Sequence, residues 1–189
     1  MGNLTDHFSG GGGGSNILEK LIWHPKGQTI TTTQGAFTSG NITTHQDFTT
    51  STMTNVNGTD FSYTPPDGTT SVFIRFEYAV RKNGSSGQQL GSVVIQVDGT
   101  EVDDSRTQWF HNTTVYKVDR KSVEAVIDIN GTESIASGSM NTWNSAKVIR
   151  LRAGVYSSAY GIRMHRLDYW LGGNTDVFVR PTITIVALK

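Results

Sequence analysis

The chain has 189 residues, of which 35% are hydrophobic and 17% are charged, and its formal net charge is zero. This length suits one domain, and zero net charge argues against nucleic-acid binding, which depends on a basic excess. The absence of cysteine excludes disulfides, cysteine metal ligands and thiol nucleophiles. No apolar run reaches the ~18–20 residues that span a bilayer, and the first residues do not resemble a signal peptide. We therefore expect neither a nucleic acid nor a membrane as a partner.

The charges are unevenly distributed along the chain. Residues 1–145 carry 9 Lys or Arg and 14 Asp or Glu, whereas residues 146–189 carry 7 and 2. Because opposite charges attract, the two parts of the chain could complement one another, within a subunit or between neighbouring subunits. The alternative is that the outward strand positions in the last part are simply basic.

Residues 1–27 predict an anchoring arm with a glycine linker. A short polar lead is followed by five glycines, residues 10–14, which have no side chains to pack and lose the most backbone entropy on ordering. Such a segment suits a protein that inserts its first residues into a larger particle and holds a domain away from it. The residues expected to anchor the arm are its apolar ones: Leu4, Phe8, Ile17, Leu18, Leu21, Ile22 and Trp23.

Residues 15–23 contain the only segment of the chain that predicts a helix. Asn16, with Glu19 three residues later, matches a capping box, and Pro25 would end the helix. An extended arm against a neighbouring subunit would use the same apolar residues, so both alternatives stay open.

From residue 28 to residue 189 the hydrophobic pattern has a period of two, which predicts β-strands. Residues 72–82 are the clearest strand, because Val72, Ile74 and Phe76 alternate with polar or charged positions such as Arg75. Pro181 cannot donate to a strand ladder and so marks an edge position or a bulge. Further strands are expected over residues 29–33, 36–50, 52–63, 91–98, 108–118, 122–129, 147–156, 163–170 and 176–188.

Turn signals separate these strands. Pro-Pro-Asp-Gly at residues 65–68, Asp98-Gly99 and Asn130-Gly131 match the preferences of β-turns and hairpins. About eight to ten strands in a body without helices predict an all-β, jelly-roll-like antiparallel β-sandwich. The predicted organisation is an arm over residues 1–27 and a β-sandwich domain over residues 28–189.

The sequence favours no catalytic or metal site. No two of the five histidines lie at the i, i+2 strand spacing that would direct both toward one metal. Asp103 and Asp104, an adjacent acidic pair, would point to opposite faces of a regular strand, and no Gly-x-Ser-x-Gly elbow is present. We therefore expect a protein that is not an enzyme and has no cofactor and no metal.

Aromatic residues in the second half of the chain are the candidates for ligand or subunit contacts. Trp and Tyr beside polar loops stack on sugar faces, but cores and subunit interfaces use the same residue types. Trp109 and Trp143 have the most polar neighbours and are expected to be the better exposed; Phe110 and Tyr156 belong to the wider set. The named candidates are Trp109, Trp143, Tyr160 and Trp170.

Three stretches of the chain resemble the small virion structural proteins of tailed bacteriophages, particularly marine phages. They are MGNLTDHFSGGGGGSNILEKLIW at residues 1–23, TPPDGTTSVFIRFEY at residues 64–78 with VDGTEV at residues 97–102, and DVFVRPTITIVALK at residues 176–189. The resemblance implies a jelly-roll-like domain that forms a homotrimer, with N-terminal arms fastened to capsid or tail proteins. The lack of a heptad repeat or a repetitive shaft favours a compact decoration protein or short fibre.

The expected function is a non-enzymatic structural role on the surface of a virion. The alternative is a receptor-binding tail-fibre or carbohydrate-binding module, which would contact a host-surface glycan through its aromatic residues.

Overall fold

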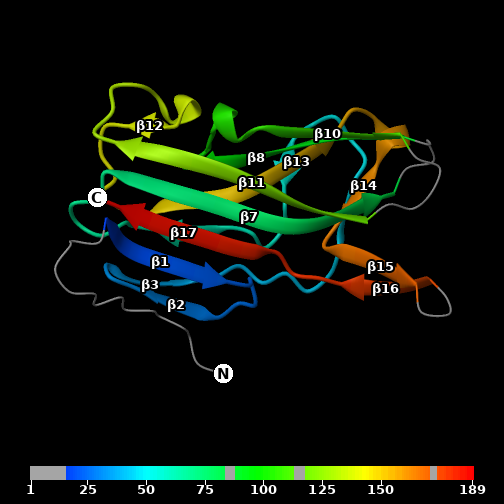
Figure 1. The fold of residues 1–189 in the computed structure, drawn as a ribbon, viewed down its shortest axis with the longest axis horizontal. Coiled ribbons are helices and arrows are strands. Elements are labelled where there is room, and N and C mark those ends of the chain that lie inside the picture. The colour runs from blue at the N-terminus through cyan, green and yellow to red at the C-terminus, as the bar shows by residue number, and fades with distance from the viewer. Residues whose placement is uncertain (1–15, 84–87, 113–117, 171–173) are drawn as a thin grey trace.

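The computed structural model describes residues 16–83, 88–112, 118–170 and 174–189, which form an almost entirely β-structured body (Figure 1). Three short 3-10 helices interrupt the strands, at Asp103–Ser105, Ile135–Ser137 and Ser158–Tyr160. The strand pairings are antiparallel except for the short parallel pairing of β11 with β12. The structure is a β-sandwich, as the hydrophobic period of two predicts.

The first sheet has the strand order β1-β17-β7-β11-β12, and β14 and β4 extend it beside the far end of β7. The bounds of its strands are β1 Ile17–Trp23, β4 Gln46–Phe48, β7 Ser71–Lys82, β11 Val118–Ile129, β12 Ser139–Met140, β14 Ile162–Met164 and β17 Thr182–Leu188. β7 lies at the centre of this sheet, because it pairs with β11 along one side and with β17 and then β14 along the other.

The second sheet has the order β10-β8-β13-β5, with β6 also paired to β13 and β9 to β8. Its strands are β5 Thr54–Asn55, β6 Phe61–Tyr63, β8 Gln88–Val97, β9 Thr100–Glu101, β10 Thr107–Asn112 and β13 Lys147–Val155. Two hairpins complete the fold: β2 Thr29–Thr32 with β3 Gly35–Thr38, and β15 Arg166–Trp170 with β16 Asn174–Phe178.

The strand order identifies the sandwich as a jelly roll. If β5 and β6 count as one interrupted strand, the principal strands in chain order are β1, β5/β6, β7, β8, β10, β11, β13 and β17. The first sheet then contains the first, eighth, third and sixth strands side by side, and the second sheet contains the second, seventh, fourth and fifth. This interleaving of two Greek keys is the jelly-roll topology, so the predicted jelly-roll-like fold is confirmed.

The core lies between the two sheets and consists of the inward positions of alternating strands. On β7 the side chains of Val72, Ile74 and Phe76 are fully buried, as the sequence pattern predicts. Ile95 on β8 and Leu151 on β13 are fully buried on the facing sheet. The alternation therefore assigns the correct face to each of these strands.

The predicted turns also form. Asp98 and Gly99 both have positive φ, at 50° and 86°, and join β8 to β9 as a two-residue hairpin turn. Asn130 has a φ of 73° and Gly68 a φ of 82°. In the turn before β7, the Thr69 N–H donates to the Pro66 carbonyl oxygen at 3.2 Å.

The predicted final strand is divided into two. Residues 174–178 form β16, which pairs with β15, whereas β17 begins at Thr182 and joins the first sheet. The break falls at Pro181, which has no N–H to donate. Its carbonyl oxygen instead lies 2.9 Å from Nδ1 of His24.

Of the two alternatives left open for residues 15–23, the helix is wrong, because residues 17–23 form strand β1. β1 pairs antiparallel with β17, from Ile17 opposite Leu188 to Trp23 opposite Ile183. A helix this short would be marginal on its own, whereas the strand buries Leu21 and Trp23 on one face. Pairing with the last strand of the chain therefore outweighs the capping-box pattern.

β1 also corrects the expected boundary between an arm and a domain at residue 27. The Trp23 ring packs edge-on against Phe37 and Phe61, at centroid distances of 5.4 and 4.9 Å. Leu21 and Trp23 are thus buried in this chain's own core, and their expected role as anchors to another molecule is wrong. Leu4, Phe8 and the glycine run lie outside the described residues.

The uneven charges are partly complemented within the subunit. Arg152 pairs with Glu101 at 2.5 Å and Lys147 with Asp98 at 3.1 Å, and Arg163 binds Asp47 through two nitrogens. Hydrogen bonding from Arg163 holds the pKa of Asp47 below its ordinary value. Three of the basic residues after position 145 therefore pair with acidic residues before it.

Candidate functional site

The outward side of the first sheet carries an unusually apolar face. Val186 on β17, Phe73 on β7 and Val126 on β11 lie opposite one another in successive register pairs. Val126 is 52% exposed, and Ile22 and Ile17 on β1 are 58% and 47% exposed. We call this the outer apolar face: Ile17, Ile22, Phe73, Val126, Val186 and Leu188.

Charged side chains border this face and neutralise one another. Arg75 bonds Glu77 at 2.8 Å and lies 3.2 Å from Glu124 on the neighbouring strand. Lys20 lies opposite Val186, so the border carries two positive and two negative charges. A face that is neutral overall can meet a copy of itself without like-charge repulsion.

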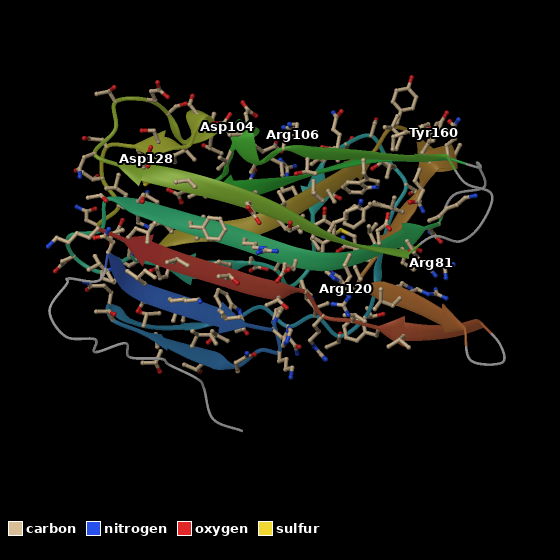
Figure 2. The ribbon with its side chains drawn as sticks, viewed as in Figure 1. Arg81, Asp104, Arg106, Arg120, Asp128 and Tyr160 are labelled. Carbon is tan, nitrogen blue, oxygen red and sulfur yellow. The ribbon has the colours of Figure 1, made fainter. Side chains whose placement is uncertain are left out.

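A second candidate surface lies on the outward side of the second sheet. Phe110 on β10 lies opposite Leu90 on β8, and the Tyr156 N–H donates to the Leu90 carbonyl oxygen at 2.9 Å. Phe110 is 56% and Tyr156 is 69% exposed. The Tyr160 ring meets the Tyr156 ring edge-on at a centroid distance of 5.6 Å. We call these four residues the aromatic surface; Figure 2 shows Tyr160 at one end of the molecule.

Trp109 and Trp143, the two aromatics expected to be better exposed, are instead buried. Their exposed fractions are 5% and 4%. Trp109 packs over Gly91, where an added Cβ would lie 2.7 Å from the indole ring. The Trp143 Nε1–H donates to the Tyr63 carbonyl oxygen at 3.1 Å, and the two rings meet edge-on. Both tryptophans therefore serve the core rather than a ligand surface.

The other two candidate aromatics differ in position. Tyr160 is half-buried and belongs to the aromatic surface. Trp170 is the last residue of β15, opposite Asn174 of β16, and only its backbone is described. Of the candidates chosen from the sequence, the described side chains bring only Tyr160 to an exposed cluster, together with Tyr156 and Phe110 from the wider set.

Sequence reasoning did not identify the outer apolar face. A signal was present, because Val126 follows the inward Ala125 and Phe73 follows the inward Val72. Each is therefore an apolar residue at an outward strand position, where polar residues are usual. Outward apolar residues become a patch only when the strand register places them side by side.

Metal-ligating residues are not gathered anywhere in the described residues: no three His, Cys, Asp or Glu side chains could hold one ion. Within the same residues, no helix is long and apolar enough to cross a membrane.

No model of a protein family matches the chain, and no curated protein matches its sequence. Among solved structures it is similar to the C-terminal domain of EclA, described as a sugar-binding protein, with 10% identity and a TM-score of 0.34 over 65% of this chain and 74% of that chain. It is also similar to the CBM36-1 domain of a multidomain xylanase from the hindgut metagenome of Trinervitermes trinervoides, with 10% identity and a TM-score of 0.30 over 87% and 96%. A third similar structure is that of infectious bursal disease virus, Gx strain, with 14% identity and a TM-score of 0.33 over 91% of this chain and 37% of that chain. All three TM-scores are low, and none of these likenesses carries an argument about function.

Proposed function

We propose that the chain is a non-enzymatic virion structural protein whose jelly-roll domains associate as a homotrimer on the particle surface. The observation that carries the proposal is the outer apolar face, where Ile17 and Ile22 on β1 and Val126 on β11 are about half exposed, with Val186 and Phe73 on the two strands between them. Exposed apolar patches on folded proteins commonly mark interaction surfaces. Around a three-fold axis three copies of this face would come together, and its neutral border would spare them like-charge repulsion, so closure would bury the face in every subunit.

The first experiment measures the native mass of the 20.6 kDa chain by light scattering over a range of concentrations. We expect a mass three times that of the chain. Val126→Asp places a charge on the most exposed apolar side chain described on β11, in the outer apolar face, where desolvation in an interface would be costly, and should give monomers. A wild-type chain that stays monomeric at every concentration would disprove the trimer.

Phe110→Asp is the matched control, because Phe110 is also exposed but lies on the second sheet. It should leave the trimer intact. If both variants dissociate the trimer equally, the outer apolar face is not the interface.

The proposal places the anchor to the particle in the residues before β1, with Leu4 and Phe8 as its apolar contacts. Ile17, Leu18 and Ile22 continue from it along β1, and two of them are about half exposed. Deletion of residues 1–15 should leave the trimer intact but remove the protein from purified particles, as measured by their protein composition. Normal incorporation of the shortened chain would contradict this anchor.

The aromatic surface supports a second candidate function, the binding of a host-surface glycan. Tyr and Phe rings offer flat faces for sugars, and Tyr156 and Phe110 are both more than half exposed. Tyr156→Ala and Phe110→Ala should each weaken glycan binding about fivefold if stacking contributes roughly 1 kcal/mol. Thr31→Ala, at an exposed position of β2 outside both surfaces, should leave it unchanged in a glycan-array assay.

A further inference from the structure

A hollow of about 200 Å³ lies on the outward side of the first sheet, where β7, β11 and the segment before β17 meet. It is distinct from the aromatic surface, which lies on the other sheet, and it adjoins the outer apolar face at Arg75. The lining residues that matter for binding are Glu77, Ala79, Arg120, Ser122, Arg180 and Thr182.

The strand register explains why the sheet is hollow there. Ala79 lies opposite Arg120, and Glu77 lies opposite both Ser122 and Thr182. The small side chain of Ala79, which is 2% exposed, therefore forms a floor between longer side chains. A hydrogen bond fixes the backbone of Ala79: the His165 N–H donates to the Ala79 carbonyl oxygen at 2.8 Å.

The lining carries an excess of positive charge. It contains Arg75, Lys121, Arg120 and Arg180 but only one carboxylate, that of Glu77. Arg75 is paired with Glu77, and Lys121 lies 3.6 Å from Asp119.

Two of these cations have no carboxylate partner among the described residues. Arg120 is exposed and makes no ion pair there, and Arg180 is half-buried with its guanidinium 5.0 Å from the centre of the Phe178 ring. Arg180 Nε is buried and has no hydrogen-bond partner within the described part of the chain. The exposed carboxylates nearest to them among the described ion pairs, Glu77 and Glu124, are both paired with Arg75. Figure 2 shows the labelled Asp104 and Asp128 toward the opposite end of the molecule from Arg81.

We infer that this hollow binds an oxyanion, and that the natural ligand is the carboxylate or sulfate group of an acidic sugar. Guanidinium groups bind planar and tetrahedral oxyanions through two parallel hydrogen bonds. Arg120 and Arg180 can each donate such a pair, because neither is paired with a carboxylate among the described residues. The hydroxyls of Ser122 and Thr182 can donate to the oxyanion or accept from sugar hydroxyls. A hollow of about 200 Å³ matches a single sugar unit rather than a long chain.

This site would recognise the charge of a glycan, whereas the aromatic surface would recognise sugar faces. The inference does not depend on trimer formation or on binding at the aromatic surface. Light scattering on the same samples separates the two questions, because loss of the oxyanion site should not change the native mass.

The test titrates the full chain at low salt with sodium glucuronate, glucose 6-sulfate, glucose and sodium sulfate, and measures binding by calorimetry. We expect the two acidic sugars to bind and glucose to bind at least about tenfold more weakly, since an ionised partner strengthens hydrogen bonds. Equal affinity for sodium sulfate and glucose 6-sulfate would overturn the sugar part of the inference. Binding of glucose as tightly as glucuronate would overturn the oxyanion part.

Arg120→Gln and Arg180→Gln should each weaken binding of the acidic sugars about tenfold. The matched control is Arg150→Gln, which removes a half-buried arginine of β13 on the second sheet and changes the net charge equally. Its affinity should match that of the wild-type chain. If all three variants weaken binding equally, the effect is general charge attraction and the site is wrong.

A fourth variant fills the hollow without removing a charge. Ala79→Val adds two methyl groups above the floor and suits a strand, so it should weaken binding while the circular dichroism melt stays cooperative. Unchanged affinity in a folded Ala79→Val chain would contradict the placement of the ligand over Ala79.

Discussion

His165 is a titratable side chain with no exposed surface. It lies between β14 and β15 with a φ of 66°, and neither ring nitrogen has a hydrogen-bond partner among the described residues. Burial disfavours the charged imidazolium and lowers the pKa of His165 to about 4. The folded chain therefore keeps a neutral histidine in a pH range where the unfolded chain would protonate it.

This difference predicts a loss of stability in mild acid. Between pH 6.5 and pH 4 the unfolded state binds the proton and the folded state does not, so the free energy of unfolding falls as the pH falls. The loss should be on the order of 3 kcal/mol across this window. Urea unfolding at pH 7, 5.5 and 4 measures it.

His165→Asn tests the assignment, because asparagine tolerates a positive φ and does not titrate. The variant should lose most of the pH dependence above pH 4, even though the smaller side chain lowers its stability at pH 7. His45→Asn, at an exposed position, should keep the wild-type slope. Equal slopes in all three chains would rule out His165 as the source.

Trp143 and Phe110 provide a second contrast between individual residues. Trp143 is 4% exposed and bonds the Tyr63 carbonyl, whereas Phe110 is 56% exposed. Trp143→Ala should lower the free energy of unfolding by about 3–5 kcal/mol, and Phe110→Ala should change it by about 0.5 kcal/mol or less. Denaturant titrations of both variants check this, and similar losses would contradict the burial of Trp143.

Among the elements, β1 shows how firmly the start of the described chain is held. Besides its pairing with β17, it carries Glu19, which accepts hydrogen bonds from the Tyr63 hydroxyl at 2.8 Å and the Thr33 N–H at 2.6 Å. These contacts join β1 to the β2–β3 turn and to the second sheet. Hydrogen bonds to a charged acceptor contribute about 1.5–3 kcal/mol each.

We therefore predict that two N-terminal deletions behave differently. Removing residues 1–15 should leave the thermal unfolding midpoint within a few degrees of wild type, because it touches none of the described contacts. Removing residues 1–23 should abolish cooperative unfolding, since it exposes the edge of β17 and removes the buried Leu21 and Trp23. Circular dichroism melts compare them. A cooperative melt of the shorter chain would show that β1 is a dispensable arm.

The sequence predicts well those features that depend on near neighbours. The alternation of Val72, Ile74 and Phe76 marks a buried face, and Asp98-Gly99 supplies the positive φ that a tight hairpin needs. It predicts less well those that depend on distant partners. β1 becomes a strand because β17, at the other end of the chain, pairs with it, and no local pattern contains that information.

The candidate sites follow the same rule. The polar neighbours of Trp109 in sequence suggest exposure, but Gly91 on the adjacent strand leaves the space that its ring fills. A glycine inside an expected strand does indicate a close approach, although not which side chain approaches. Arg120 and Arg180 line the same hollow only because β11 and the segment that leads into β17 both lie beside β7, so their shared position could not be predicted from spacing.

At the scale of the whole molecule, the two sheets present different surfaces to their surroundings. The outer apolar face and the oxyanion hollow belong to the first sheet, and the aromatic surface belongs to the second. Self-association through the outer apolar face, which lies along the Ser71–Arg75 part of β7, therefore leaves the hollow beside Glu77 and Ala79 and the outward side of the second sheet outside the contact. An assembly of this kind would display several copies of the aromatic surface at once, and linked copies strengthen weak binding through high effective concentration.

The jelly-roll topology also makes the last strand essential to folding. β17 lies between β1 and β7, which come from the start and the middle of the chain, and Ile183, Ile185 and Ala187 fill the core. A chain that ends at residue 181 would leave one edge of β7 and the whole of β1 unpaired. Unpaired edges beside an open core favour aggregation.

We predict that the chain of residues 1–181 is insoluble or lacks a cooperative melt, whereas removal of Lys189 alone changes the melting midpoint little. Lys189 makes one backbone hydrogen bond, from its N–H to the Asn16 carbonyl oxygen at 2.7 Å, worth about 1 kcal/mol. Because β1 joins the first sheet only by pairing with β17, the two ends of the chain must come together during folding. Refolding of the full chain should therefore also be slow, in the range of milliseconds to seconds. Stopped-flow fluorescence of the buried tryptophans measures this rate. Refolding that is complete within microseconds would contradict the need to bring the two ends of the chain together. A cooperative melt of the chain without β17 would contradict the role of β17 in joining β1 to β7.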